Sequence, residues 1–171
     1  MIKPLTTENL QSKFGKIDFE IIESTEESRC ITLSNGGSTL VLAVSYFFQV
    51  PENLASLRKK IILGSLIGET LKRSTIDFDK CEIHKYILKL PEKIKQAFLS
   101  KPDYCLGNLY DILIMQNNIK IPFCRIFEIY DPVVNLAIVD NTRIFRDTPI
   151  SQIRNMDKLI KKYNLNTATL L

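Results

Sequence analysis

Hydrophobic and polar residues alternate along residues 16–23, where Ile17, Phe19 and Ile21 are separated by Asp18 and Glu20. Such alternation places the apolar side chains on one face and predicts a half-buried strand. Apolar runs rich in β-branched and aromatic residues, bounded by turn residues, predict five more strands. The six predicted strands cover residues 16–23, 29–33, 39–48, 81–90, 109–115 and 120–130.

Apolar residues at helical spacing predict helices before, between and after these strands. Residues 4–14 are expected to form a short helix or ordered arm, with Thr6 or Thr7 as its N-cap. Residues 51–63 are expected to form a helix because Pro51 suits the first turn. Further helices are predicted over residues 66–71, 91–99 and 149–163.

A tight hairpin turn is predicted at residues 35–37, Asn-Gly-Gly, because these residue types adopt the positive φ angles that such turns require. A two-residue loop places Arg29 opposite Leu42 or Val44, depending on which two residues form it. A three-residue loop would instead place Arg29 beside Val41, Ala43 and Ser45.

A second hairpin is predicted around residues 116–118, Gln-Asn-Asn, between the last two strands. Strands paired as hairpins, with helices inserted between them, predict an α+β fold built on an antiparallel sheet of about six strands. We expect one domain over residues 1–132. Residues 133–171 are expected to form a C-terminal extension docked on the same domain.

The composition is that of a globular chain, with 45% hydrophobic and 25% charged residues. The longest apolar stretches, residues 39–50 and 109–115, are too short to span a bilayer as helices, so we expect no membrane span. The net charge of +4 comes from residues 141–171, where basic side chains lack interleaved aromatics. That pattern is typical of a solvated helix face, so we expect no nucleic-acid partner.

Cysteine and histidine are too sparse for metal or nucleophile chemistry. The four cysteines are widely spaced and form no Cys-x-x-Cys pair, and His84 is the single histidine. We therefore expect no metal site. No nucleophile motif accompanies His84, which is typical of an ordinary surface or groove histidine.

Glu128 is a lone carboxylate inside the apolar run of residues 121–130. Burying a carboxylate costs several kcal/mol unless it is paired, hydrogen-bonded or used. Arg29 opens another apolar segment, where alternation places it on the same face as Ile31 and Leu33. These two residues suggest a pocket for an anionic small molecule. The alternatives are a structural ion pair between them, or a Glu128 that faces solvent on an edge strand.

The order of the predicted elements, with three landmarks, resembles the chorismate lyase family. The first landmark is Arg29 at the start of a strand, followed by a short turn and by Ala43-Val44-Ser45 in the next strand. The second is Ile67-Gly68, after the central helix. The third is Glu128 in the last core strand, after Pro122. They cover residues 5–132. Ser45 makes the chain more similar to the cyanobacterial and plastid-type branch. The resemblance implies a plastid location, with the cytoplasm as the alternative.

The resemblance implies a lyase that removes pyruvate from chorismate to give 4-hydroxybenzoate, a quinone precursor, without a cofactor. Arg29 would bind a substrate carboxylate through parallel hydrogen bonds. Glu128 would act as general acid, carry the ring proton, or hydrogen-bond the 4-hydroxyl. The remaining substrate-binding residues that the resemblance implies are Ile67 and Gly68 at the ring, Thr7 near the mouth, and Ser45.

The second carboxylate of chorismate requires another partner, because residues 109–111 lack the arginine expected in the penultimate strand. Lys85 and His84 are the candidates. A competing function is a non-catalytic module that binds an aromatic acid, since effector domains of some transcription regulators share this architecture. The residues before the first strand are too few for a helix-turn-helix reader. A third alternative is a scaffold in which Arg29 and Glu128 simply pair.

Overall fold

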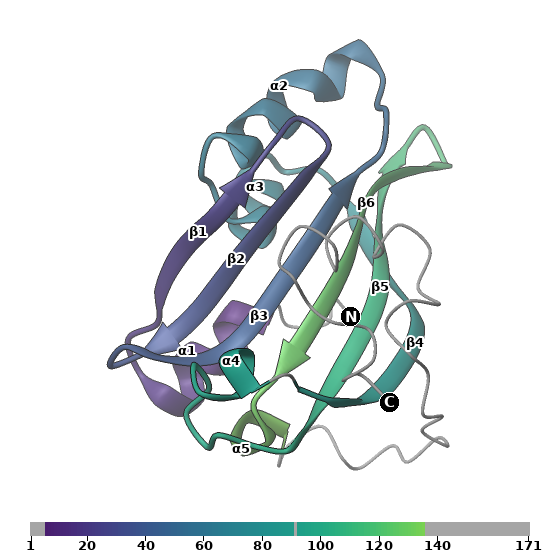
Figure 1. Ribbon diagram of the computed structural model, residues 1–171. Coiled ribbons are helices and arrows are strands. Elements are labelled where there is room, and N and C mark those ends of the chain that lie inside the picture. The colour runs from purple at the N-terminus through teal and green to yellow at the C-terminus, as the bar shows by residue number, and fades with distance from the viewer. Residues whose placement is uncertain (1–5, 91, 136–171) are drawn as a thin grey trace.

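The computed structural model describes residues 6–90 and 92–135, whose arrangement is shown in Figure 1. Six strands form one sheet in the order β1-β2-β3-β6-β5-β4, and every neighbouring pair is antiparallel. The strands are β1 (Asp18–Ser24), β2 (Ser28–Asn35), β3 (Ser38–Phe47), β4 (Phe78–Lys89), β5 (Tyr104–Gln116) and β6 (Ile119–Tyr130). The helices are α1 (Thr6–Phe14), α2 (Glu52–Ile62), α3 (Ile67–Arg73), α4 (Glu92–Lys95) and α5 (Pro132–Asn135). The predicted α+β fold with an antiparallel sheet is confirmed.

The observed elements differ from the predicted ones mainly in length. β4 begins at Phe78 and β5 at Tyr104, before their predicted starts, because the two strands pair along their whole length. The helix predicted over residues 91–99 is shorter, since α4 ends at Lys95. The helix predicted over residues 149–163 lies outside the described residues.

β1 is more exposed than its alternation predicted. Phe19 and Ile22 expose 36% and 48% of their surface. β1 is the edge strand and pairs only with β2, and a β-bulge between Ile21 and Glu23 interrupts its alternation. The predicted strand is confirmed, and Ile17 and Ile21 of its predicted apolar face pack against the core, whereas Phe19 is exposed.

The first hairpin turns through Gly36 and Gly37, whose φ angles are 57° and 83°. A β-bulge beside this turn adds one residue, Leu40, to β3, so Arg29 lies opposite Ser45. Both registers predicted from a two-residue loop are therefore wrong. The extra residue produces the neighbours expected for a three-residue loop, because it shifts the pairing by one position.

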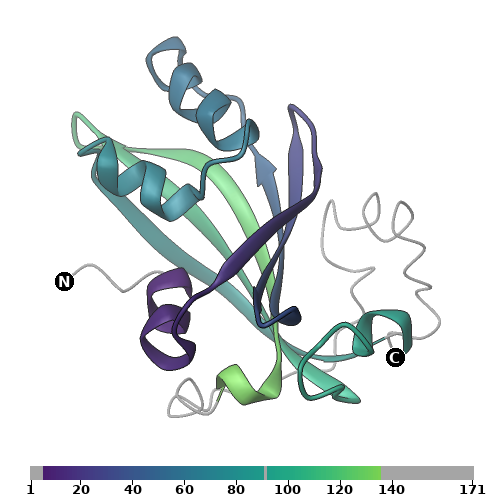
Figure 2. The ribbon, with the colours of Figure 1, turned by 90° about the vertical axis from the view of Figure 1, so that its left-hand side faces the viewer.

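The two faces of the sheet carry different helices, as Figure 2 shows. α1, α2 and α3 pack against one face, which we call the inner face, and α4 lies on the other side, the outer face. Buried residues of the helices on the inner face are Leu10 of α1, Leu54, Leu57 and Ile61 of α2, and Ile67 and Leu71 of α3. The helical layer on the inner face is the one that encloses the candidate site.

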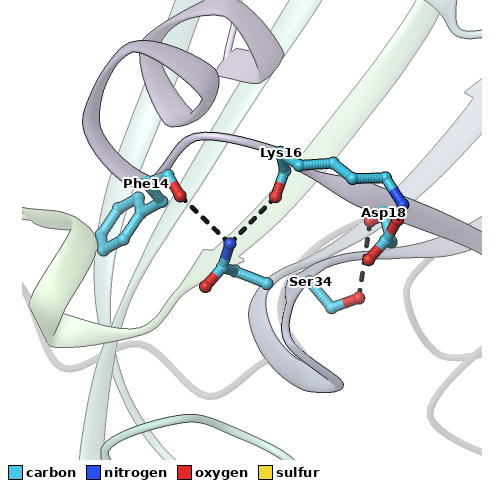
Figure 3. A network of polar contacts seen from close by, with 5 residues as sticks. Phe14, Lys16, Asp18 and Ser34 are labelled. Atoms are coloured by element: carbon cyan, nitrogen blue, oxygen red, sulfur yellow. Dashed lines mark hydrogen bonds and ion pairs between the residues drawn. The ribbon is translucent and has the colours of Figure 1, made fainter.

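Polar contacts fix the end of α1 to the first hairpin (Figure 3). The Asn35 side-chain amide donates hydrogen bonds to the carbonyl oxygens of Phe14 at 3.1 Å and Lys16 at 2.9 Å. Lys16 also forms an ion pair with Asp18 at 2.9 Å. These contacts hold α1 over the inner face, where its first residue, Thr6, reaches β6.

The outer face is packed too tightly at Gly107 of β5 to accept one more methyl group. A Cβ atom built at Gly107 would lie 2.8 Å from Leu88 Cδ1 and 2.9 Å from Phe127 Cζ. We expect Gly107→Ala to lower the free energy of unfolding by about 1–3 kcal/mol, as measured by urea denaturation. Without a clash, replacing glycine by alanine would instead raise the free energy of unfolding by about 0.4–1 kcal/mol, because alanine lowers the entropy of the unfolded chain. A variant as stable as the wild type would contradict this packing argument.

Candidate functional site

A cavity of about 70 Å³ lies between the inner face of the sheet and the helices α1 and α3. It has room for several water molecules, since one water needs about 10–15 Å³ on this measure. Its apolar lining consists of Ile31, Leu33, Ala43, Leu66, Ile67, Leu71, Ile112 and Ile126. Its polar side chains are Thr6, Thr7, Arg29, Ser45, Lys80, Tyr110 and Glu128. A mostly apolar lining with a few polar groups is typical of a small-molecule site, whereas the volume is below the roughly 300–1,000 Å³ of most ligand pockets.

The strand register explains why Arg29 and Glu128 reach the same cavity. Arg29 pairs with Ser45, which in turn pairs with Ile126 on β6. Glu128 lies two residues beyond Ile126 and therefore on the same face of the sheet. The two charged side chains thus enter the cavity from strands that are separated only by β3.

Arg29 is almost completely buried, with 1% of its surface exposed. Its Nη1 donates hydrogen bonds to the carbonyl oxygens of Ile61 at 2.8 Å and Ser65 at 2.6 Å, at the C-terminal end of α2. Helix C-termini stabilise cations, because their carbonyl groups carry partial negative charge. The Arg29 Nε is buried and has no partner among the described residues. Burial lowers the pKa of Arg29 to about 10, so the guanidinium is still charged at neutral pH.

Glu128 is also buried, with 5% of its surface exposed. Its Oε2 accepts a hydrogen bond from the Thr6 hydroxyl at 3.1 Å and another from the Tyr130 hydroxyl. Burial, followed by the charge of Glu128, raises the pKa of Tyr130 and of Tyr110 well above the ordinary tyrosine value. Both phenols therefore keep their protons at neutral pH, and Tyr130 remains a donor to the carboxyl group.

Arg29 and Glu128 line one cavity without forming an ion pair with each other. No ion pair among the described residues joins Arg29 to Glu128. Main-chain carbonyl groups accept hydrogen bonds from Arg29, and hydroxyl groups donate hydrogen bonds to Glu128. β6 lies between β3 and β5, so Glu128 is not on an edge strand either. Both structural alternatives, an ion pair and a solvent-facing carboxylate, are therefore wrong. Neither charge neutralises the other.

The cavity contains most, but not all, of the substrate-binding residues predicted from the sequence. Ile67, Gly68, Thr7 and Ser45 line it together with the charged pair. Ile67 and Gly68 open α3, Thr7 lies on α1, and Ser45 is the partner of Arg29 on β3.

His84 and Lys85, the candidates for the second carboxylate, are not part of the cavity lining. A β-bulge between Glu82 and His84 shifts the pairing of β4, so that His84 lies opposite Leu109, a residue of the outer-face core. Lys85 lies opposite Asn108, beyond the lining residues of β5. The expectation that either residue contributes to this cavity is corrected. The bulge, which cannot be read from the alternation of residues, accounts for His84, whereas Lys85 lies too far along β4.

Lys80 is a cation of the cavity that the sequence reasoning missed. It lies on β4 opposite Ile112, and its Nζ is 3.7 Å from the centroid of the Tyr110 ring. The predicted strand began one residue later, which excluded Lys80 from consideration. Tyr130 was also missed, although it lies two residues after Glu128 on one strand, where alternation places both side chains on the same face.

The chain matches none of the protein-family models searched, and the search of curated proteins gives no match either. In the part of the chain that the structure describes, no helix has both the length and the apolar character needed to cross a membrane. The functional argument therefore depends on the site itself.

The hydrogen bond from Tyr130 supports the buried carboxyl group of Glu128. We expect Tyr130→Phe to lower the free energy of unfolding by about 1–3 kcal/mol, because a buried polar group loses a donor. Urea denaturation measures the change, and Tyr104→Phe is the control, since Tyr104 is 56% exposed. In the Glu128→Gln background the effect of Tyr130→Phe should become smaller. Equal losses in both backgrounds would contradict the contact.

Arg29 brings a positive charge into the cavity, and its pKa of about 10 sets the pH range over which we expect an anion to bind there. In a Glu128→Gln variant, which lacks the neighbouring titratable carboxyl group, benzoate should bind with constant affinity from about pH 6 to about pH 9. A further Arg29→Met substitution should abolish binding, as measured by calorimetry. The control is Arg58→Met, because Arg58 donates to the Glu26 carbonyl and does not line the cavity. Equal losses for both arginines would exclude a specific role for Arg29.

Proposed function

We propose that this protein is a chorismate lyase, which eliminates pyruvate from chorismate and releases 4-hydroxybenzoate. One observation carries the proposal: a buried arginine and a buried glutamate line one cavity and do not pair with each other. The order of the three sequence landmarks supports the same activity. The reaction demands these two kinds of group, one to hold an anion and one to carry a proton.

The proposed reaction needs no external reactant. The bond between the ring carbon and the enolpyruvyl oxygen breaks, the neighbouring ring carbon loses its proton, and the leaving enolpyruvyl group gains one proton as it becomes pyruvate. Protons and electrons balance within the substrate, and aromatisation of the ring drives the step. The protein has to position chorismate and move one proton, which is work for side chains alone.

Arg29 is proposed to bind the ring carboxylate. Its guanidinium is fixed before a ligand arrives, because two carbonyl oxygens hold Nη1. The buried Nε lacks an acceptor among the described residues, as expected of a donor reserved for a ligand. A charge-assisted hydrogen bond contributes on the order of 1.5–3 kcal/mol, which sets orientation and affinity but not the whole reaction barrier.

Glu128 is proposed to carry the proton. Its Oε2 already accepts two hydroxyl groups, from Thr6 and Tyr130. The hydroxyl group of Tyr110 also interacts with this carboxyl group. Fixing one oxygen orients the other, and a positioned acid or base of this kind contributes about 10²–10⁴-fold in rate.

The apolar wall of the cavity suits a six-membered carbon ring. Ile67 and Leu71 approach it from α3, and Ile112 and Ile126 approach it from the sheet. Such a wall excludes water, and exclusion of water strengthens the interactions of both charged residues with the substrate. Gly68 also lines the cavity and has no side chain to occupy it.

The test is to incubate the full chain with chorismate and to measure 4-hydroxybenzoate and pyruvate separately. We expect equal amounts of both products. Glu128→Gln should lower kcat by about 10²–10⁴-fold, because the amide cannot carry the proton, while 4-hydroxybenzoate still binds. The control is Glu20→Gln, which changes an exposed glutamate of β1 and should leave kcat unchanged.

Three other results would contradict the proposal in part or as a whole. Tight binding of 4-hydroxybenzoate by the wild-type chain without turnover would identify a binding module for aromatic acids. Turnover that survives Glu128→Gln would show that another group moves the proton. Absence of both binding and turnover would contradict the proposal as a whole.

A further inference from the structure

Lys80 enters the cavity from the side of Glu128 opposite to Arg29. β2 and β4 each lie two strands away from β6, on opposite sides of it. With neighbouring strands about 4.8 Å apart, each of their backbones is about 10 Å from that of β6 in a flat sheet. Arginine and lysine side chains are long enough to cover much of that distance, and both residues line the same cavity. Along the strands, Arg29 is level with Ile126 and Lys80 is level with Cys124. The two cations therefore approach the cavity from opposite sides of β6.

The contacts of Lys80 leave its ammonium group free to meet an anion. Nζ lies over the ring of Tyr110, at 3.7 Å from the centroid, and a cation–π contact does not use up its N–H donors. The ion pairs among the described residues include none for Lys80. The carboxylate of Asp79, its neighbour in sequence, pairs with Lys120 at 3.1 Å instead.

The two cations differ in depth. Arg29 exposes 1% of its surface, whereas Lys80 is half-buried and lies on β4, at the edge of the sheet. The deep cation suits the part of the substrate that enters furthest, and the shallower cation, which water and salt screen more strongly, suits the part nearer the solvent.

We propose that Lys80 binds the carboxylate of the enolpyruvyl arm, while Arg29 binds the ring carboxylate. The assignment rests on the proposed lyase function and makes Lys80 a specificity-determining residue for a substrate with two carboxylates. It places the ether bond that breaks between the two anchored carboxylates. It also supplies the partner for the second carboxylate that neither His84 nor Lys85 provides in this cavity.

The test compares a ligand with two carboxylates and a ligand with one. Lys80→Met should weaken chorismate binding and raise its KM by roughly 10- to 100-fold, the loss of one charge-assisted contact. Affinity for 4-hydroxybenzoate should stay within about two-fold of wild type, because this acid lacks the enolpyruvyl carboxylate. Lys80→Arg should retain most of the chorismate affinity, since it keeps the charge.

Lys59→Met is the matched control, because it removes an exposed lysine of α2 that does not line the cavity. It should change neither affinity. Calorimetry on Glu128→Gln measures chorismate binding without turnover, and Lys80→Met in that background should show the same loss.

The possible failures are distinguishable. If the wild-type chain turns over chorismate and Lys80→Met leaves its KM unchanged, the role of Lys80 is wrong and the lyase function stands. Equal weakening of both ligands would mean that Lys80 binds the ring carboxylate, which also overturns the assignment. If the wild-type chain binds chorismate without turnover and Lys80→Met selectively weakens that binding, the anchor stands and the lyase function fails. If chorismate does not bind at all, both proposals fail.

Discussion

The burial of the Arg29 guanidinium is the constraint around which this site is built. A buried cation is costly unless the protein supplies acceptors, and here the main chain at the end of α2 supplies them through Ile61 and Ser65. Because a backbone meets the cation, no acidic side chain has to do so. Glu128 can therefore share the cavity with Arg29 without neutralising it, which keeps one positive and one acidic group separate in a water-poor space.

Glu128 is held by side-chain hydroxyl groups and not by main-chain carbonyl groups. Thr6 from α1 and Tyr130 from β6 both donate to a single oxygen of Glu128, so elements from opposite ends of the described chain meet at one carboxyl group. α1 is positioned for this contact by its hydrogen bonds to Asn35 in the first hairpin. The hairpin, the helix and the carboxyl group are thus linked through one chain of contacts.

The sequence was sufficient for the sheet architecture and for the two charged residues, because both follow from alternation and from the cost of burying charge. The sequence did not predict the register in which the strands pair. The bulge at Leu40 shifted the neighbours of Arg29, and the bulge before His84 moved that residue to the outer face. Lys80 was missed because β4 starts earlier than its apolar run, and pairing with β5 sets that start. Bulges and strand ends depend on partners that a single segment does not reveal.

Reliance on peptide carbonyls has an evolutionary consequence. Every amino acid offers the same carbonyl oxygen, so positions 61 and 65 can change identity without depriving Arg29 of its acceptors, provided that the end of α2 keeps its path. Much of the surrounding lining is simply apolar, and apolar residues substitute for one another readily at constant volume. Substitutions can thus remove sequence similarity around such a site while its electrostatics persist. Among proteins of this kind, common ancestry would be easier to detect by comparing structures than by comparing sequences.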